Sequence, residues 1–528
     1  MVCVILKAEK GRNVSAFRGH QEKPVSFRQE EKMSKKIEDL QKYLEKMNRY
    51  NHVVTLLYWD MRTGIPKGGF ESHADAVAFF STEHFQMSVA EELGDILDAL
   101  MATEEYESLD DTWKFIVKKM KREFDKNKQI PKEVFEAYVI AQSEAEHYWE
   151  EAKNKSDYSV FAPKLQKIIE LTKEITGYTD PGQDIYDALL NQYEEGMDSA
   201  TIDKIFGELK EELVPLIAQV TADELPENPK FDSSFDVDAQ EKVQKMLLDY
   251  MGFSWEKGAV GRTEHPFTLN FSSNDVRVTN HYYENKPISA IFSAIHEGGH
   301  AIFEQNVNPE YNGTVAGSCC YMGIHESQSR FYENMLGRNK NFWVPIYDKL
   351  GDILPQFKEI SLDEFYREIN RVENSFIRTE ADELTYGIHV ILRYEIEKAI
   401  FRDNVDVNVL PQLWNKKMQE YLGITPKNDA EGILQDMHWS GGSFGYFPSY
   451  LLGNVYDGML REQVEKELGS IDTILAEGRI MEITKWLNEK IHKFGSTRLP
   501  KDTLLAVCGS EVTAQPLIQY FKEKYPLK

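Results

Sequence analysis

The chain has 528 residues, of which 41% are hydrophobic and 28% charged, a composition typical of a folded protein large enough to enclose a deep cleft. Its net charge of −26 makes a nucleic-acid backbone or an anionic membrane surface an unfavourable partner. The four cysteines are too few for a disulfide framework, and no uninterrupted apolar stretch of about 18 residues occurs. We therefore expect a cytoplasmic protein that binds neither nucleic acid nor membranes.

The first part of the chain is predicted to be helical. Residues 1–32 are polar and lack periodicity, so we expect an N-terminal extension that is disordered. Amphipathic helical patterns then follow one another through residues 33–222, for example at 111–127 and 159–176. These patterns predict an N-terminal helical region.

Proline marks the boundary between this region and the rest of the chain. Pro226 and Pro229 lie in segment 223–235, which we predict to separate the helical region from a second region at 236–528. No Pro-rich, Gly/Ser-rich or like-charge tract is long enough to act as a flexible linker. We therefore expect the two regions to form one domain, 33–528.

A small sheet is predicted within the second region. Short runs of β-branched and aromatic residues, bounded by Ser, Asn and Asp, occur between residues 258 and 283. Helical periodicity resumes at Ile288 and is expected to persist to the C-terminus, except at the glycine-rich segment 440–445. The expected fold is all-α, with a deep cleft and a small β-sheet beside the helix that begins near Ile288.

That helix carries the motif His-Glu-x-x-His at residues 296–300. Residues four apart share one helical face, so His296 and His300 can bind one cation, while Glu297 lies beside it within reach of a water. Zinc is the expected metal, and cobalt or manganese are possible substitutes because the same ligands accept several divalent ions. Gly298 and Gly299 each cost about 1 kcal/mol relative to alanine, so we expect another element to pack closely against them.

A catalytic zinc needs a third protein ligand and an open position. The metzincin pattern would require histidine at position 306, which is Asn306 here. The other common solution is a glutamate on a following helix, and the acidic stretch 325–333 supplies one. Glu326 is the predicted third ligand, and Glu333 is the competing candidate.

These groups predict peptide hydrolysis. Zinc would polarise the scissile carbonyl, and Glu297 would act as general base and return the proton to the leaving amine. Such a site also needs a donor for the tetrahedral oxyanion. The downstream segment 432–450 offers His438, Tyr446 and Tyr450 as candidates.

With these motifs the chain resembles the carboxypeptidase Taq family of metallocarboxypeptidases, over about residues 33–528. The family's signatures occur in its order: Tyr58-Trp-Asp60, Pro66-Lys-Gly-Gly69, His265-Pro-Phe267, Asp275-Val-Arg-Val-Thr279, His296-Glu-Gly-Gly-His300, His325-Glu-Ser-Gln328, Ile377-Arg-Thr-Glu-Ala-Asp382, Gly432-Ile-Leu-Gln-Asp-Met-His-Trp439 and Trp486-Leu-Asn-Glu-Lys-Ile-His492. The resemblance implies an almost wholly helical homodimer that removes single residues from peptide C-termini with broad specificity. In the related thimet oligopeptidase and angiotensin-converting enzyme groups, a histidine and a tyrosine act near the oxyanion, and His438 and Tyr450 are similarly placed.

A carboxypeptidase must also hold the free carboxylate of its substrate. In a chain with a charge of −26, a planar arginine fork is the suitable group. Arg378 is the first candidate and Arg277 the second, with His265 as a possible neighbour on the substrate side.

Two alternative functions remain open at this stage. A related endo-acting oligopeptidase would cleave peptides with an amidated C-terminus, whereas a carboxypeptidase should lose most of its activity on them. A non-catalytic metal-binding protein would need no general base, so Glu297 argues against that alternative.

Overall fold

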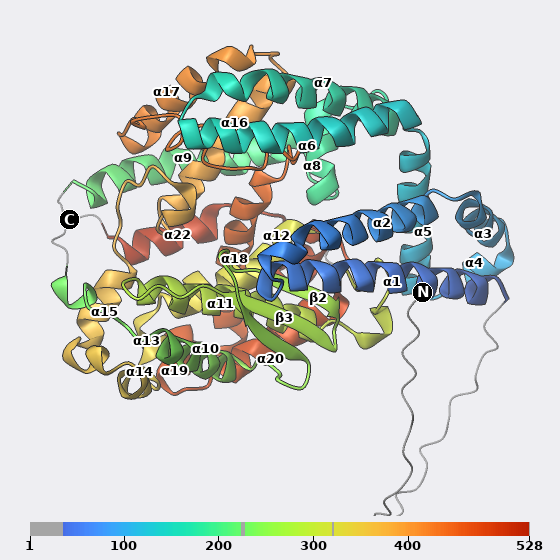
Figure 1. The fold of residues 1–528 in the computed structure, drawn as a ribbon. Helices are drawn as coiled ribbons and strands as arrows, with labels where there is room; N and C mark the ends of the chain where they lie inside the picture. The colour runs from blue at the N-terminus through green and yellow to red at the C-terminus, as the bar shows by residue number, and fades with distance from the viewer. Residues whose placement is uncertain (1–34, 223–227, 319–320, 527–528) are drawn as a thin grey trace, which may run out of the picture.

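Helices dominate the structure, a computed structural model that describes residues 35–222, 228–318 and 321–526 (Figure 1). The predicted extension at residues 1–32 lies outside the described residues. The first helices in the chain are α1 (Lys35–Thr63), α2 (Phe70–Ser88), α3 (Glu91–Met101), α4 (Glu104–Ser108), α5 (Asp111–Lys128), α6 (Lys132–Lys155), α7 (Ala162–Thr179), α8 (Ile185–Tyr193) and α9 (Ser199–Val220). The helices predicted at 111–127 and 159–176 are confirmed as α5 and, slightly shifted, α7.

The second part of the chain is also mostly helical. Its helices are α10 (Val237–Met251), α11 (Pro287–Gln305), α12 (Met322–Arg330), α13 (Lys340–Trp343), α14 (Tyr347–Ile353), α15 (Leu362–Ile369), α16 (Tyr386–Phe401), α17 (Leu410–Leu422), α18 (Phe447–Leu468), α19 (Ile471–Ala476), α20 (Ile480–Lys490), α21 (Pro500–Cys508) and α22 (Gln515–Lys524). A π-helical turn, η5 (Phe331–Gly337), continues α12. No described helix combines the length and the apolar character needed to cross a bilayer.

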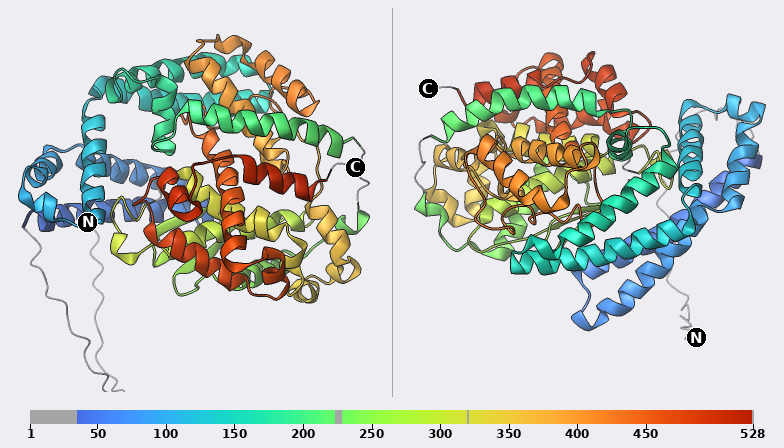
Figure 2. Two further views of the ribbon diagram at one scale, coloured as in Figure 1. Left: turned by 180° about the vertical axis from the view of Figure 1, so that it is seen from behind. Right: turned by 90° about the horizontal axis from the view of Figure 1, so that it is seen from above.

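The apolar core is divided between two clusters. The larger cluster extends from α6 to α22, and the smaller one joins the start of α1 to α3 and α5 through residues such as Leu40, Leu97 and Val117. Helix α2 has no buried residue and packs mainly on α1. Seen from above, the blue and cyan helices α1–α5 stand to one side of the body formed by the later helices (Figure 2). The N-terminal helices therefore form an arm beside the main core.

The predicted sheet is confirmed and has the strands β1 (Gly258–Arg262), β2 (Thr268–Ser272) and β3 (Asp275–Asn280). The strand order is β1-β3-β2, with β1 parallel and β2 antiparallel to β3. Val276 and Val278 of β3 are fully buried, and both β3 and β2 pack against α11. The opposite face of the sheet meets the end of α1, where Trp59 contacts Phe267 edge to face. The sheet thus lies between the motif helix and the N-terminal arm.

The prediction that helix continues to the C-terminus is wrong between α17 and α18. This stretch forms turns rather than helix, so the break is much longer than segment 440–445. Gly423 ends α17 with a φ of 69°, and Gly442 and Gly445 adopt φ values of 72° and 83°. Such left-handed residues do not continue a helix, and the apolar residues between them pack into the core without helical order.

The predicted close approach at the motif glycines is confirmed. A Cβ atom on Gly299 would lie 2.6 Å from the carbonyl oxygen of Gln328, in the backbone of α12. A Cβ on Gly298 would lie 2.7 Å from a methyl group of Leu248 in α10. The cost of these glycines in helix propensity is therefore offset by close contact of Gly299 with α12 and of Gly298 with α10.

We predict that Gly299→Ala destabilises the protein by about 1–3 kcal/mol, because backbone atoms of α12 must move to admit the methyl group. Gly207→Ala is the matched control, since Gly207 lies within α9 and nothing occupies the space within 4 Å of its added Cβ. This control should gain up to about 1 kcal/mol through helix propensity. Denaturant unfolding of both variants measures the difference, and equal stability would contradict the proposed backbone contact.

Candidate metal centre

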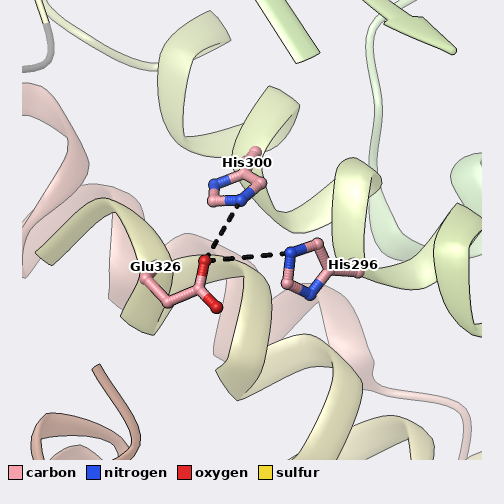
Figure 3. Close-up of side chains that lie close together, drawn as sticks. All are labelled: His296, His300 and Glu326. Atoms are coloured by element: carbon pink, nitrogen blue, oxygen red, sulfur yellow. Dashed lines mark ion pairs between the residues drawn. The ribbon is translucent and has the colours of Figure 1, made fainter. Parts of the chain in front are cut away.

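Two histidines of α11 and one glutamate of α12 converge at the contact between these helices (Figure 3). The Nε2 atoms of His296 and His300 lie 3.8 Å and 3.6 Å from the same oxygen, Oε2 of Glu326. All three ligand atoms lie within 4.8 Å of one another. A tetrahedral zinc with bonds of about 2.0–2.2 Å places its ligand atoms roughly 3.3–3.6 Å apart. The group could therefore hold such a cation.

Glu333 occupies a different position from the three grouped residues. Its Oε2 atom lies 2.8 Å from Nδ1 of His296, on the side of the ring away from Glu326. Accepting the Nδ1 proton leaves the lone pair of Nε2 free for a metal. Burial would raise the pKa of Glu333, but Arg330 and His296 outweigh it and hold that pKa well below its ordinary value. The structure thus groups Glu326, not Glu333, with the two Nε2 atoms.

Arg330 connects the two glutamates and was not among the predicted site residues. Its Nε donates to Oε1 of Glu326 at 2.8 Å, and its Nη1 donates to Oε2 of Glu333 at 3.2 Å. The guanidinium also lies 4.2 Å from the ring centre of Tyr386 in α16. A single planar group therefore fixes both carboxylates. Arg330 follows Glu326 by four residues and precedes Glu333 by three. This helical spacing is the sequence signal that could have indicated Arg330 as a site residue.

Glu297 points from α11 toward β2. It is buried, and its Oε2 accepts a hydrogen bond of 2.6 Å from the hydroxyl of Thr268. Burial raises the pKa of Glu297, while the charge of His296 and the Thr268 bond act in the opposite direction. The sheet therefore holds the predicted base in one orientation beside the two histidines.

A second set of polar residues, which includes His325 and Glu304, supports the ring of His300. Its ring stacks on that of His325 at a centroid distance of 4.3 Å, and Nε2 of His325 lies 2.9 Å from Oε1 of Glu304. Asn270 of β2 donates to the other oxygen of Glu304. These contacts tie the start of α12 to α11 and to the sheet.

The N-terminus of α12 is held by a glutamate from the first part of the chain. Glu194, in the turn after α8, is fully buried and accepts hydrogen bonds from the backbone N–H of Gly323 and the hydroxyl of Tyr456. Burial raises the pKa of Glu194 to about 7. A Cβ on Gly323 would lie 2.6 Å from this carboxyl group, so a larger residue there would force the Glu194 carboxyl group to move. Glu194 and its partners are far apart in the chain, so no local sequence pattern indicates this support.

Helix α18 packs against α12 opposite α11. A Cβ on Gly453 would lie 3.1 Å from Cγ of Glu326, so the missing side chain gives the ligand room. One turn later, Asp457 is fully buried, and neither of its carboxyl oxygens has a hydrogen-bond partner. Burial and the charge of Glu326 raise the pKa of Asp457 well above its ordinary value. A protonated Asp457 avoids adding another negative charge beside Glu326.

The three predicted oxyanion residues lie together. Nε2 of His438 is 3.1 Å from the hydroxyl of Tyr450, and the rings of Tyr446 and Tyr450 are 4.9 Å apart. Tyr450 precedes Gly453 by three residues on α18, so it lies on the helix face that meets Glu326. Burial lowers the pKa of His438 to about 4, which makes it neutral at physiological pH.

Arg378 lies against this cluster and is 6% exposed. Its Nε and Nη2 donate to Oδ1 of Asp436 at 3.1 and 2.9 Å, its Nη1 donates to the hydroxyl of Tyr386 at 3.0 Å, and its guanidinium lies 4.9 Å from the ring centre of Tyr450. Arg393 pairs with the same aspartate. Two guanidinium groups thus share one carboxylate, which leaves an excess positive charge next to the predicted oxyanion residues.

The structure does not bring Arg277 or His265 to the metal ligands. Alternation along β3 places Arg277 on the sheet face opposite Val276 and Val278, away from α11. There it pairs with Asp275 through two hydrogen bonds of 2.9 and 2.8 Å. His265 is exposed in the connection between β1 and β2. A role of either residue in binding substrate stays a prediction.

Several known proteins are similar to this chain over most of its length. The chain is 44% identical over 484 residues to carboxypeptidase 1 of Bacillus subtilis, covering 91% of this chain and 96% of that protein. It is 34% identical to thermostable carboxypeptidase 1 of Thermus thermophilus, covering 89% of this chain and 94% of that protein. The crystal structure of an M32 carboxypeptidase from Deinococcus radiodurans superposes with a TM-score of 0.90 at 29% identity, covering 93% of this chain and 99% of that one.

The family-level comparison covers nearly all of the described chain. The sequence pattern of the carboxypeptidase Taq (M32) metallopeptidases matches residues 39–525, which include every residue of the candidate metal centre. The resemblance expected from the sequence motifs is thereby confirmed. The chain belongs to the carboxypeptidase Taq (M32) family and is a metallocarboxypeptidase, a peptide hydrolase.

Proposed function

We propose that this protein is a zinc-dependent carboxypeptidase that releases single amino acids from peptide C-termini with broad specificity. The observation that carries the proposal is the convergence of His296, His300 and Glu326 at one point. A second cluster, around Arg378, carries excess positive charge. It contacts Tyr450 of α18, the helix that packs on Glu326. A metal and a carboxylate-binding group on the two sides of a scissile bond are what an exopeptidase of this class requires.

His296, His300 and Glu326 would hold the metal, with cobalt or manganese as possible substitutes for zinc. Bound there, zinc would supply Lewis acidity toward the scissile carbonyl and lower the pKa of a water to about 7. Glu297 would accept the proton of the attacking water and donate it to the leaving amine. The Thr268 hydrogen bond supports this role, because it fixes the direction in which the carboxylate faces.

His438, Tyr446 and Tyr450 would stabilise the developing oxyanion. With a pKa of about 4, His438 is neutral at physiological pH and can act as a hydrogen-bond donor. The Tyr450 hydroxyl lies within hydrogen-bonding distance of His438 and on the face of α18 that meets Glu326. We propose Tyr450 as the principal donor and His438 as the group that orients it.

Arg378 would receive the C-terminal carboxylate of the substrate. Three of its N–H groups are directed to Asp436 and Tyr386, which fixes the plane of the guanidinium. An oriented guanidinium can form further hydrogen bonds with its remaining N–H groups at little entropic cost. Arg393 contributes to the same positive field because it shares Asp436.

We further propose a cytoplasmic homodimer with one catalytic domain at residues 33–528. The α1–α2 hairpin supports the dimer, because Leu56, Tyr58, Phe70 and Phe79 are large apolar side chains exposed on it. Exposed apolar groups gathered on one element are typical of a protein interface. The low cysteine content supports a reducing compartment.

The proposed activity is tested by mass spectrometry on one short peptide, supplied as the free acid and as the C-terminal amide. We expect zinc-loaded protein to remove C-terminal residues stepwise from the free acid alone, because the amide lacks the charge that Arg378 would bind. Chelator-stripped protein is the control and should be inactive. Internal cleavage of both peptides would instead indicate an oligopeptidase, and no cleavage with any metal would indicate a non-catalytic binding protein.

Glu297→Gln should retain the metal and lose turnover by orders of magnitude, because the amide preserves shape but cannot accept the water proton. The Thr268 hydroxyl can still donate to the amide oxygen of the variant, so the local fold should persist. Metal content by mass spectrometry and kcat on the free-acid peptide are measured together. Full activity in the variant would exclude Glu297 as the base.

Arg330→Gln should weaken zinc binding by about 10–100-fold, because Glu326 and Glu333 lose the group that orients them. Arg330→Lys keeps the charge but not the planar fork, so its affinity should fall between those of the wild type and the Gln variant. Arg479→Gln, at an exposed arginine of a surface ion-pair cluster, is the control. Chelator competition measures the zinc affinities, and unchanged affinity in Arg330→Gln would contradict the role of Arg330.

A further inference from the structure

A cavity of about 520 Å³ adjoins the metal centre on its sheet side. Its walls come from α1, α2, α5, β2, the end of α11, residues 312–318 and the first turn of α12. Such a volume is typical of sites that take small molecules or side chains. The cavity is therefore large enough to receive part of a peptide substrate.

None of the proposed metal ligands lines the cavity, but two of its lining residues, Thr268 and His325, contact groups of the metal centre. Thr268 holds Glu297 through a hydrogen bond of 2.6 Å, and the His325 ring stacks on His300. The cluster around Arg378 instead approaches from α18, which packs on the other side of Glu326. The cavity and the positive cluster thus lie on different sides of the metal ligands.

Charge determines which end of a peptide suits the cavity. Among the described residues that line it there is no lysine or arginine, and Glu304 carries its only carboxylate. A free C-terminal carboxylate would therefore meet repulsion in the cavity and attraction near Arg378. A peptide that places its carboxylate at Arg378 extends its upstream residues toward the cavity.

The lining also indicates which side chains fit. The apolar part of the lining consists of Leu44, Met47, Met120, Phe271, Val315 and Met322. Asn48 and Asn51 supply neutral polar groups. Methionine side chains are flexible and polarisable, so they adapt to apolar groups of different shape. The wall therefore favours large aliphatic or aromatic side chains without selecting a single one.

We propose that this cavity is the subsite for the residue immediately upstream of the scissile bond, with preference for large apolar side chains over acidic ones. The proposal rests on the proposed carboxypeptidase function, because the position of the C-terminal carboxylate sets the direction of the peptide. It assigns to the N-terminal arm, through Leu44 and Met47 of α1, a part in substrate selection.

Met47→Trp tests the proposal by filling the cavity from α1. Peptides that share one released residue but carry Gly, Phe or Glu immediately before it are compared by kcat/KM. The variant should lose about tenfold or more on the Phe peptide while the Gly peptide changes little, since a filled pocket rejects only the larger group. Met101→Trp is the matched control, because Met101 is a partly exposed methionine of α3 outside the cavity lining.

Glu304→Gln tests the charge of the cavity. It should raise kcat/KM for the Glu peptide relative to the Phe peptide, since the repelling carboxylate is removed. Equal effects of either substitution on all three peptides would overturn the proposal. The proposal would also be overturned if the substitutions changed the preference for the released residue and not the preference for the upstream residue.

Binding provides a readout that does not depend on turnover. Titration calorimetry of the same three peptides with chelator-stripped protein should show that Met47→Trp weakens binding of the Phe peptide selectively. Failure of the wild type to release C-terminal residues would refute the proposed function, while this binding difference would still test the cavity. Unchanged binding of the Phe peptide would refute the cavity assignment alone.

Discussion

The close approach of α11 and α12 at Gly299 is the constraint on which the site depends. Because no Cβ separates the two backbones there, Glu326 can bring its carboxylate to the Nε2 atoms of both motif histidines. Gly453 likewise lacks a side chain, which allows α18 to approach Glu326 closely. Three helices therefore meet around one carboxylate, and glycine rather than a special loop makes the meeting possible.

Burying this many charges requires that each be compensated. Arg330 lies between Glu326 and Glu333, and its guanidinium faces Tyr386, whose hydroxyl accepts from Arg378. The metal ligands and the proposed carboxylate-binding group are thereby connected through arginines and one aromatic ring. In a low-dielectric interior such a network is costly to leave incomplete, so it favours a single arrangement of its members.

The first part of the chain, from α1 to α8 and the turn after it, contributes to the site although it carries none of the metal ligands. Glu194 fixes the start of α12 from the turn after α8, and α1 closes one wall of the cavity beside Thr268. The later helices thus carry the reacting groups. The first part of the chain stabilises the position of α12 and forms part of the cavity wall.

The sequence by itself determined the parts whose information is local. The spacing of His296 and His300, the small sheet and the tight packing at Gly299 all follow from helical or strand periodicity and glycine chemistry. Only the tertiary structure decided the rest. Glu326 and Glu333 lie on one helical segment, and their positions in the sequence do not distinguish their roles. In the structure, Glu326 faces Nε2 of His296 and Glu333 faces Nδ1. Likewise, the direction of Arg277 away from α11 depends on strand register, and the contact of Glu194 with α12 depends on packing between residues distant in the chain. Periodicity records neither of them.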